Sequence, residues 1–329
     1  MVLLAVALPC LLLLPWTAQK SSYDGQRLVE TATRHAPGRI EWQVDAPSPA
    51  PGVPAVPETK SAFEPFGTDY MGRSLLARCL LGGAISLGLG LAAAAVAVVI
   101  GTAWGALAGY AGGRVDAVLM RIVDVLYGLP YILIVVMISV AVLGFMDKSQ
   151  SVVAKAKESG DLSLGLKILD VLQQYPLAIN LATLVLAIGG VSWLTMARVI
   201  RGQVLSLRAQ PFVEAARAVG CGPARIFFRH LLPNCLGPII VYATLAVPGA
   251  ILEESFLSFL GIGVQAPLPS WGGLAADGVR ELASLGQVGM KVHGWLLVFP
   301  CVLLGLTLLA LNFLGDALRE KMDPRSVKR

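Results

Sequence analysis

Charged residues are scarce in this sequence of 329 residues. They make up 14% of it, whereas hydrophobic residues make up 56%, and the mean hydropathy is +0.71. Soluble domains carry about 25% charged residues, so the composition excludes an ordinary soluble protein. Several apolar segments are long enough to cross a bilayer as helices. The composition therefore predicts an all-α polytopic membrane protein.

Residues that commonly build metal or nucleotide sites are also few. The sequence has three histidines, no HExxH or CxxC pattern, and no Gly-Lys dipeptide of the kind that a P-loop requires. We therefore expect no metal site, no cofactor and no ATP site in this chain. The five cysteines lie mostly in or beside apolar segments and imply no disulfide framework.

The basic residues, in contrast, gather at two places. One group surrounds a central polar loop that contains a single acid, Glu214, and the other lies at the C-terminus: Arg198, Arg201, Arg208, Arg217, Arg225 and Arg229, then Arg319, Lys321, Arg325, Lys328 and Arg329. Basic residues beside membrane spans mark the cytoplasmic side, which explains both groups better than nucleic-acid binding does. We therefore expect both regions in the cytoplasm, with membrane lipid and no nucleic acid as a partner.

Hydropathy and charge divide the chain into four parts. Residues 1–16 are expected to form a first transmembrane helix, although the run is short for a span and a signal-peptide core stays open as the alternative. Residues 17–80 form a polar extracytoplasmic segment with an extended, Pro-rich patch at 46–57. Residues 81–316 form the transmembrane core, and residues 317–329 form the cytoplasmic tail.

The core is expected to bring the number of transmembrane helices to about six, with spans near residues 83–110, 122–143, 176–199, 236–260 and 295–314. A polar insert at 146–175 should lie on the outer face, either as a solvated elaboration or where a partner docks. A stripe of glycines at four-residue spacing, Gly101, Gly105 and Gly109, favours close helix packing. The tripeptide Gly128-Leu129-Pro130 predicts a kink or local unwinding.

The cytoplasmic loop at 201–234 contains a charged, helix-forming stretch, PFVEAARAVGCGPARIFFRHLLPN. Its first half predicts a short helix from Pro211 to Val219, which Gly220 ends in the left-handed conformation. A second helix is expected to start at Pro223 and to end at Pro233.

Side chains on the first of these helices divide between two faces. Glu214 and Arg217 are three residues apart and can pair on the water-facing side. Val213, Ala216 and Val219 share an apolar face. The small residues Ala215 and Ala216 allow another protein surface to approach closely.

This loop resembles a motif of a known family. Glu214-Ala215-Ala216, Gly220 four residues later and Leu232-Pro233 resemble the EAA loop of the membrane subunits of bacterial ABC importers, in the dipeptide, oligopeptide and nickel branch. Four more blocks follow the family order: Pro65 to Arg73, Met120 to Asp124, Ser258 to Gly272, and Asn312 to Arg325. The chain departs from the family pattern at Ser74, which replaces an acid, and in the longer insert at 146–175.

The resemblance implies a permease subunit of an ATP-driven importer for peptides or related small solutes, with the type I importer fold, in the bacterial inner membrane. Partner ATPase subunits would bind ATP, and a homologous second permease and an extracytoplasmic substrate-binding protein would complete the complex. The chain would be a transport subunit and no enzyme. Its coupling to the ATPase would rest on Glu214, Ala215, Ala216, Arg217, Gly220 and Pro233. The alternative is an ATP-independent channel or secondary carrier, which would predict paired intramembrane charges and an inverted repeat; neither is visible in the sequence.

Two neighbouring acids, Glu253 and Glu254, fall within the predicted span at 236–260. A charge at such depth costs several kcal/mol unless it faces a cavity or a partner. Each acid therefore either lines a translocation pathway, where it would suit a substrate with a charged amine, or is a hydrogen-bonded structural group at a subunit interface. Glu254 matches an acid of the family, whereas Glu253 stands where the family often has an uncharged polar residue.

Overall fold

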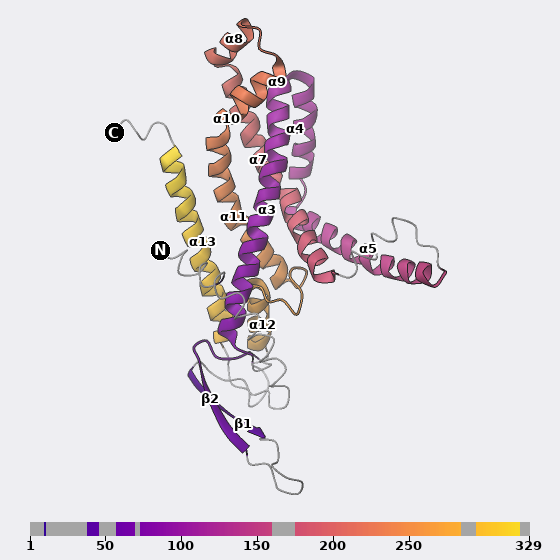
Figure 1. The fold of residues 1–329 in the computed structure, drawn as a ribbon, viewed down its shortest axis with the longest axis vertical. Coiled ribbons are helices and arrows are strands. Elements are labelled where there is room, and N and C mark those ends of the chain that lie inside the picture. The colour runs from indigo at the N-terminus through magenta and orange to yellow at the C-terminus, as the bar shows by residue number, and fades with distance from the viewer. Residues whose placement is uncertain are drawn as a thin grey trace. The chain divides into compact units, whose positions relative to one another are not determined.

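The computed structural model describes residue 10 and residues 38–45, 57–69, 73–159, 175–283 and 294–322. These residues are mostly helical (Figure 1). The chain divides into two units: unit 1 comprises residues 1–85 and 266–307, and unit 2 comprises residues 86–265 and 308–329. Each unit has its own packed interior.

Four helices in the described ranges are long and apolar enough to cross a membrane: α3 (Leu75–Ala111), α7 (Pro176–Arg208), α11 (Leu236–Phe259) and α13 (Trp295–Met322). A fifth candidate is a broken span formed by α4 (Gly113–Tyr127) and the first part of α5 (Tyr131–Ser159). The all-α polytopic class is thus confirmed. The predicted first transmembrane helix lies outside the described residues, apart from Cys10, which is helical and buried.

The break between α4 and α5 falls at the predicted kink. The two helices meet at 86° across residues 128–130, so the chain changes direction more sharply here than at a kink within one helix. Pro130 disfavours the helical conformation at the residue before it and lacks the N–H that would continue α4, so the chain restarts as α5. Helix α5 then continues past Met146 to Ser159, so the predicted polar insert begins as a helix; residues 160–174 lie outside the described ranges.

Unit 1 contains a feature that the sequence analysis did not predict, an antiparallel hairpin of β1 (Gly38–Asp45) and β2 (Pro57–Glu64). Gly38 pairs with Glu64 at one end and Asp45 with Pro57 at the other. The sequence of β1, GRIEWQVD, alternates polar and apolar residues, which is the period of a strand. The Pro-rich patch joins the strands and, apart from Pro57 at the start of β2, lies outside the described residues.

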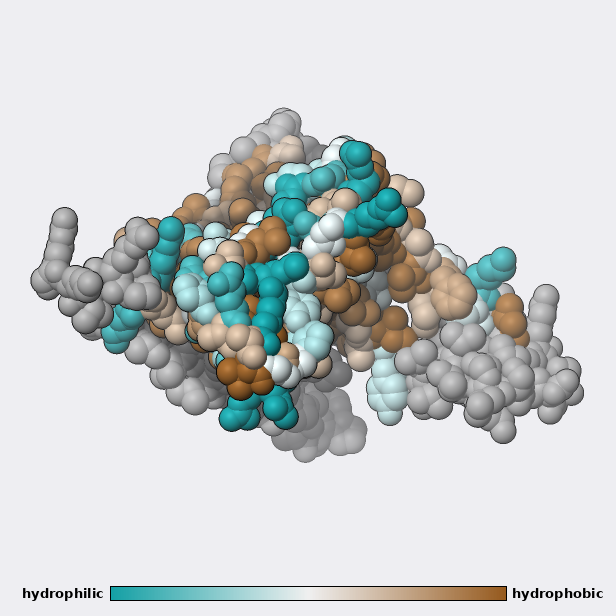
Figure 2. Space-filling model, turned by 90° about the horizontal axis from the view of Figure 1, so that it is seen from above, coloured by the Kyte–Doolittle hydropathy of each residue, from teal (hydrophilic) through white to brown (hydrophobic). Residues whose placement is uncertain are grey.

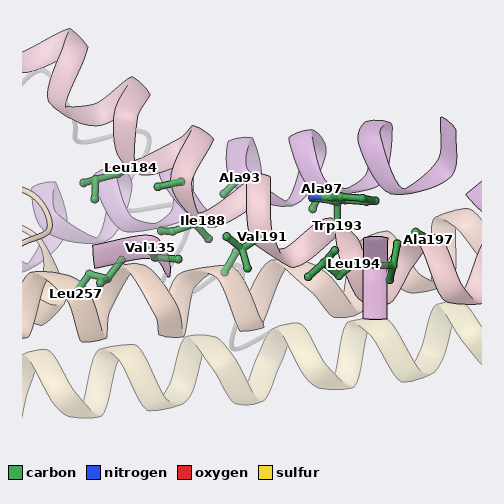
Figure 3. Packing of buried hydrophobic residues seen from close by; sticks show 13 residues of the cluster. Ala93, Ala97, Val135, Leu184, Ile188, Val191, Trp193, Leu194, Ala197 and Leu257 are labelled. Atoms are coloured by element: carbon green, nitrogen blue, oxygen red, sulfur yellow. The ribbon is translucent and has the colours of Figure 1, made fainter. Parts of the chain in front are cut away.

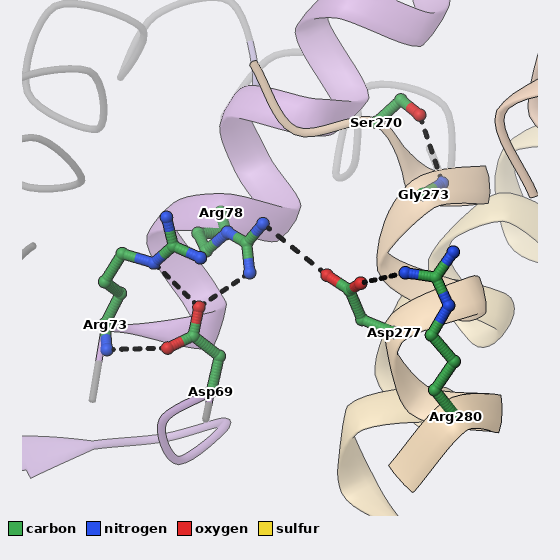
Figure 4. A network of polar contacts seen from close by, with 7 residues as sticks. All are labelled: Asp69, Arg73, Arg78, Ser270, Gly273, Asp277 and Arg280. Carbon is green, nitrogen blue, oxygen red and sulfur yellow. Dashed lines mark hydrogen bonds and ion pairs between the residues drawn. The ribbon is translucent and has the colours of Figure 1, made fainter. Parts of the chain in front are cut away.

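A buried carboxylate organises the turn before α3 (Figure 4). Asp69, whose side chain is 2% exposed, accepts hydrogen bonds from the backbone N–H and Nε of Arg73, and one of 2.6 Å from Arg78. Arg78 also approaches Asp277 of α12 (Trp271–Ala283) at 3.8 Å. Burial raises the pKa of Asp277, an effect that Arg78 opposes. Asp69 thereby closes the turn that precedes α3.

The interior of unit 2 centres on α7, which supplies most of its buried side chains and packs with residues of α3, α4, α5 and α11 (Figure 3). The glycine stripe on α3 packs closely, as predicted, and the helix it meets, which the sequence did not indicate, is α7. A Cβ added at Gly101 would lie 2.5 Å from Cβ of Met196, and one at Gly109 would lie 2.9 Å from the carbonyl oxygen of Arg201. At Gly105 it would collide with the carbonyl group of Ala197. Only glycine permits this approach of two backbones.

We expect Gly105→Ala to lower the stability of the detergent-solubilised protein by about 1–3 kcal/mol, because the added methyl group meets the backbone of α7 instead of a flexible side chain. Thermal unfolding followed by size-exclusion chromatography measures the effect. Gly88→Ala is the matched control on the same helix, since a Cβ there has nothing within 4 Å. Equal melting temperatures for the two variants would contradict the packing role of Gly105.

Candidate functional site

The loop between α7 and α11 begins with α8 (Pro211–Ala218), as the sequence predicted. Gln210 caps the helix in an extended conformation, and Pro211 occupies the first turn, where a missing N–H costs little. Gly220 has a φ of 83°. The N–H of Gly220 bonds to the carbonyl of Arg217, and that of Cys221 bonds to the carbonyl of Ala216. These two bonds form a Schellman motif, which fixes the direction of the chain after α8.

One face of α8 packs onto the rest of unit 2. Val213 is fully buried, and Ala216 packs beside it against a cluster that includes Ile200 and Val204 of α7. Val219 was expected on the same apolar face, but it is 84% exposed. The reason is that Val219 is the cap residue after the last helical position, so the helical spacing no longer applies to it.

The opposite face of α8 is exposed. It carries Glu214, Ala215 and Arg217, and the described loop contains no ion pair between Glu214 and Arg217. Phe212 is 39% exposed beside them. Viewed from the α8 end, hydrophilic and hydrophobic residues are interspersed on the surface (Figure 2).

The second half of the loop differs from the prediction. It forms α9 (Pro223–Ile226), a π-helical turn η1 (Phe227–Leu231) and α10 (Leu232–Asn234), so the helix continues through Pro233 instead of ending there. The N–H of Leu232 bonds to the carbonyl of Phe227, five residues earlier. This wider turn accommodates the missing N–H of Pro233. Cys235 then leads directly into α11.

Tyr110, near the end of α3, anchors this loop. Its hydroxyl group donates a 2.9 Å hydrogen bond to the carbonyl of Pro223, and its ring centroid lies 5.3 Å from that of Phe227. Arg208 of α7 donates to the carbonyl of Tyr110 at 2.8 Å. The sequence analysis missed Tyr110, since a single tyrosine more than a hundred residues from its partners gives no local signal.

Helix α4 is held to α7 by two ion pairs. Arg201 forms a bidentate pair with Asp116 at 2.5 and 2.7 Å. Arg198 bonds to Asp124 at 2.9 Å, and its guanidinium lies 4.0 Å from the ring centroid of Tyr127. The sequence analysis interpreted both arginines only as markers of the cytoplasmic side. In the structure they also position the broken span.

The two acids of α11 occupy different surroundings. Glu253 lines a cavity of about 660 Å³ and accepts hydrogen bonds from the hydroxyl groups of Tyr131 and Ser192. Glu254 is completely buried and accepts a 2.7 Å bond from Ser258, whose oxygen accepts the N–H of Val264. Glu254 thereby supports the turn that follows α11. No group of three or more potential metal ligands occurs among the described residues.

Comparison with known proteins identifies the family. Residues 101–328 match the family of binding-protein-dependent transport system inner membrane components. The chain belongs to this family. This permease is 40% identical over 81% of its length to the oligopeptide transport system permease protein OppC of Haemophilus influenzae, and covers 72% of that protein. It is 44% identical over 79% of its length to OppC of Escherichia coli, covering 72%. It is 39% identical over 80% of its length to the dipeptide transport system permease protein DppC of Bacillus subtilis, covering 70%.

The fold of the permease also has a solved counterpart. A chain in a crystal structure of the MetNI methionine ABC transporter, in an inward-facing conformation, superposes with a TM-score of 0.50. The match covers 73% of this chain and 94% of the other, at 17% identity. The likeness therefore concerns the fold, and it agrees with the predicted importer permease architecture.

For the permease we expect reversal of either partner of the Arg201–Asp116 pair to lower the melting temperature, and the combined reversal to restore it. Each single change places two like charges together, and the coupling energy should be about 1 kcal/mol. The Arg198–Asp124 pair is the control, because its side chains are 37% and 58% exposed and exposed pairs contribute less. Simple additivity at the Arg201–Asp116 pair would show that it does not hold α4 to α7.

Proposed function

We propose that this permease is the membrane-spanning subunit of an ATP-driven importer for peptides or related small solutes, in the bacterial inner membrane. Its relatives named above are permeases of oligopeptide and dipeptide transport systems. The observation that carries the proposal is the construction of α8, which is buried on one side by Val213 and exposed on the other. A helix held in this way presents a fixed surface to a partner.

The partner at this surface is an ATPase subunit, which binds the ATP that this chain has no P-loop to hold. Glu214, Ala215 and Arg217 contact it, with Phe212 and Val219 as exposed apolar groups beside them. Ala216 and Gly220 allow close approach and the turn after α8. Because the ATPase docks in the cytoplasm, α8 lies on that side of the membrane, as do both ends of the chain.

Motion of the ATPase reaches the membrane through the contacts of the loop. The packing of Val213 transmits this motion to α7. The Tyr110–Pro223 hydrogen bond transmits it to α3. The helix that continues through Pro233 transmits it to α11. An element that couples two sites must respond to both, and this loop contacts three of the five helices that line the cavity with Glu253.

The complete importer contains, besides this chain, two ATPases, a homologous second permease and an extracytoplasmic substrate-binding protein. The chain itself is a transport subunit without a cofactor or an enzymatic reaction of its own. The alternative, an ATP-independent channel or secondary carrier, has no observation in its favour in the described part of the chain.

The docking proposal predicts that Glu214→Lys abolishes recovery of the ATPase when the tagged permease is purified from detergent-solubilised membranes. Reversing the charge on the exposed face of α8 removes an attraction and adds a repulsion at the contact. Glu320→Lys, an equally drastic change at an exposed position of α13, is the control and should retain the ATPase. If no P-loop ATPase is recovered even with the unmodified permease, the importer proposal fails.

The coupling proposal predicts that Gly220→Val reduces transport at least tenfold while expression stays normal. A β-branched residue at this positive φ costs about 1–2 kcal/mol, so α8 would turn away from its docking position. Gly222→Val is the matched control, since Gly222 has a φ of −66° that valine tolerates, and a Cβ at either position meets nothing within 4 Å. Uptake of radiolabelled peptide by cells measures both variants, and unchanged uptake by Gly220→Val would refute the coupling role of this turn.

A further inference from the structure

Two cavities in unit 2 share a wall. One, of about 660 Å³, is lined by residues of α3, α4, α5, α7 and α11, and the other, of about 340 Å³, lies between α5 and α11. Tyr131 and Glu253 line both. The larger cavity is within the range of about 300–1,000 Å³ that is common for small-molecule sites. Among the described residues that line the two cavities, Glu253 is the single charged one.

The carboxylate of Glu253 is held on one side and open on the other. The hydroxyl group of Tyr131 donates to Oε2, and that of Ser192, whose proton is shared with the carbonyl of Ile188 at 2.8 Å, lies 3.2 Å from the same oxygen. Oε1 accepts no hydrogen bond from any described residue. Two donors from different helices fix the orientation of the carboxylate, because rotation would break both bonds. The remaining oxygen is therefore positioned for a ligand.

The lining of the larger cavity limits what that ligand can be. Apolar side chains predominate, and the polar groups near Glu253 are hydroxyl groups, including those of Thr195 and Tyr242. A divalent metal ion needs several oxygen ligands that include more than one carboxylate in most sites, and one carboxylate among apolar walls does not provide them. A primary ammonium has three donors and suits one carboxylate oxygen with hydroxyl groups around it. The cavity thus favours a ligand that places one ammonium group at Glu253 and an uncharged, largely apolar stretch along the neighbouring walls.

We infer that Glu253, oriented by Tyr131 and Ser192, binds the N-terminal ammonium group of a peptide as it passes through this permease. The inference rests on the proposed import of peptides and adds a specificity-determining residue to it. The acid is placed where the two cavities meet, so the ammonium group is held at the boundary while the rest of the peptide lies along apolar walls. Neighbouring Glu254 has no such role, because its carboxylate is buried away from both cavities.

The test is uptake into proteoliposomes that contain the complete importer, with trialanine and N-acetyl-trialanine as probes. Both are supplied with saturating substrate-binding protein. We expect Glu253→Gln to lower the uptake rate of trialanine about tenfold, the usual size of a lost charge-assisted hydrogen bond, with no effect on the N-acetyl peptide. Glu253→Asp, which keeps the charge, should recover part of the rate.

Glu254→Gln is the matched control on the same helix. It should lower the melting temperature of the complex without changing the ratio of the two uptake rates. If Glu253→Gln transports trialanine at the normal rate, slows both peptides equally, or reduces the amount of assembled complex, the ammonium site is refuted. Failure of the proposed function would look different, because the unmodified importer would then take up neither peptide, and the ammonium site would fall with it.

Discussion

The close contact between the backbones of α3 and α7 is the constraint on which unit 2 depends. Three glycines spaced by four residues bring these helices together along about two turns, and the aromatic rings of Trp104 and Trp193 meet edge to face beside them. In a membrane, lipid is as apolar as a buried leucine, so association of helices relies on such packing and on buried polar contacts. Because α7 is fixed by α3, it can in turn serve as the support for α4, α8 and α11.

Polar contacts then fix the register of α4 on α7 and the position of the loop after α7, which the glycine contact does not determine. Apolar packing alone would allow α4 to slide along α7, whereas a bidentate pair such as Arg201–Asp116 defines one register. Tyr110 fixes the loop after α7 in the same manner. Its hydroxyl group donates to the backbone carbonyl of Pro223, and its ring packs against that of Phe227. The π-helical turn contributes a different property. Each of its hydrogen bonds spans five residues instead of the four of an α-helix, and turns of this kind often occur at functional sites. It lies between the surface of α8 and the cavity-lining helix α11.

Much of this architecture follows from the sequence, and the exceptions have physical reasons. Long apolar runs, the glycine stripe and the Pro211–Gly220 signals act locally, so most of the described spans, the close packing of the glycine stripe and α8 were predicted, whereas the helix that meets the stripe was not. The end of the second loop helix was placed at Pro233, because proline usually stops a helix; a π turn before it removes the conflict. Val219 was assigned to a buried face by helical spacing that no longer holds at a cap. The ion pairs and the role of Tyr110 depend on partners distant in sequence, which no local pattern encodes.

The two adjacent acids of α11 show why sequence reasoning reached the right segment but left their roles open. Consecutive residues of an α-helix point about 100° apart, so Glu253 and Glu254 must face different surroundings. The sequence shows that each acid would be energetically unfavourable inside the membrane without a partner. It does not show which side chain lies opposite each acid. Helix α7 and the start of α5 supply Ser192 and Tyr131 to one, and the turn after α11 supplies Ser258 to the other. The 86° break at residues 128–130 is what places Tyr131 there. A bend that the Gly128-Leu129-Pro130 tripeptide predicts only as a kink thus supplies the cavity-facing acid with its hydroxyl partner.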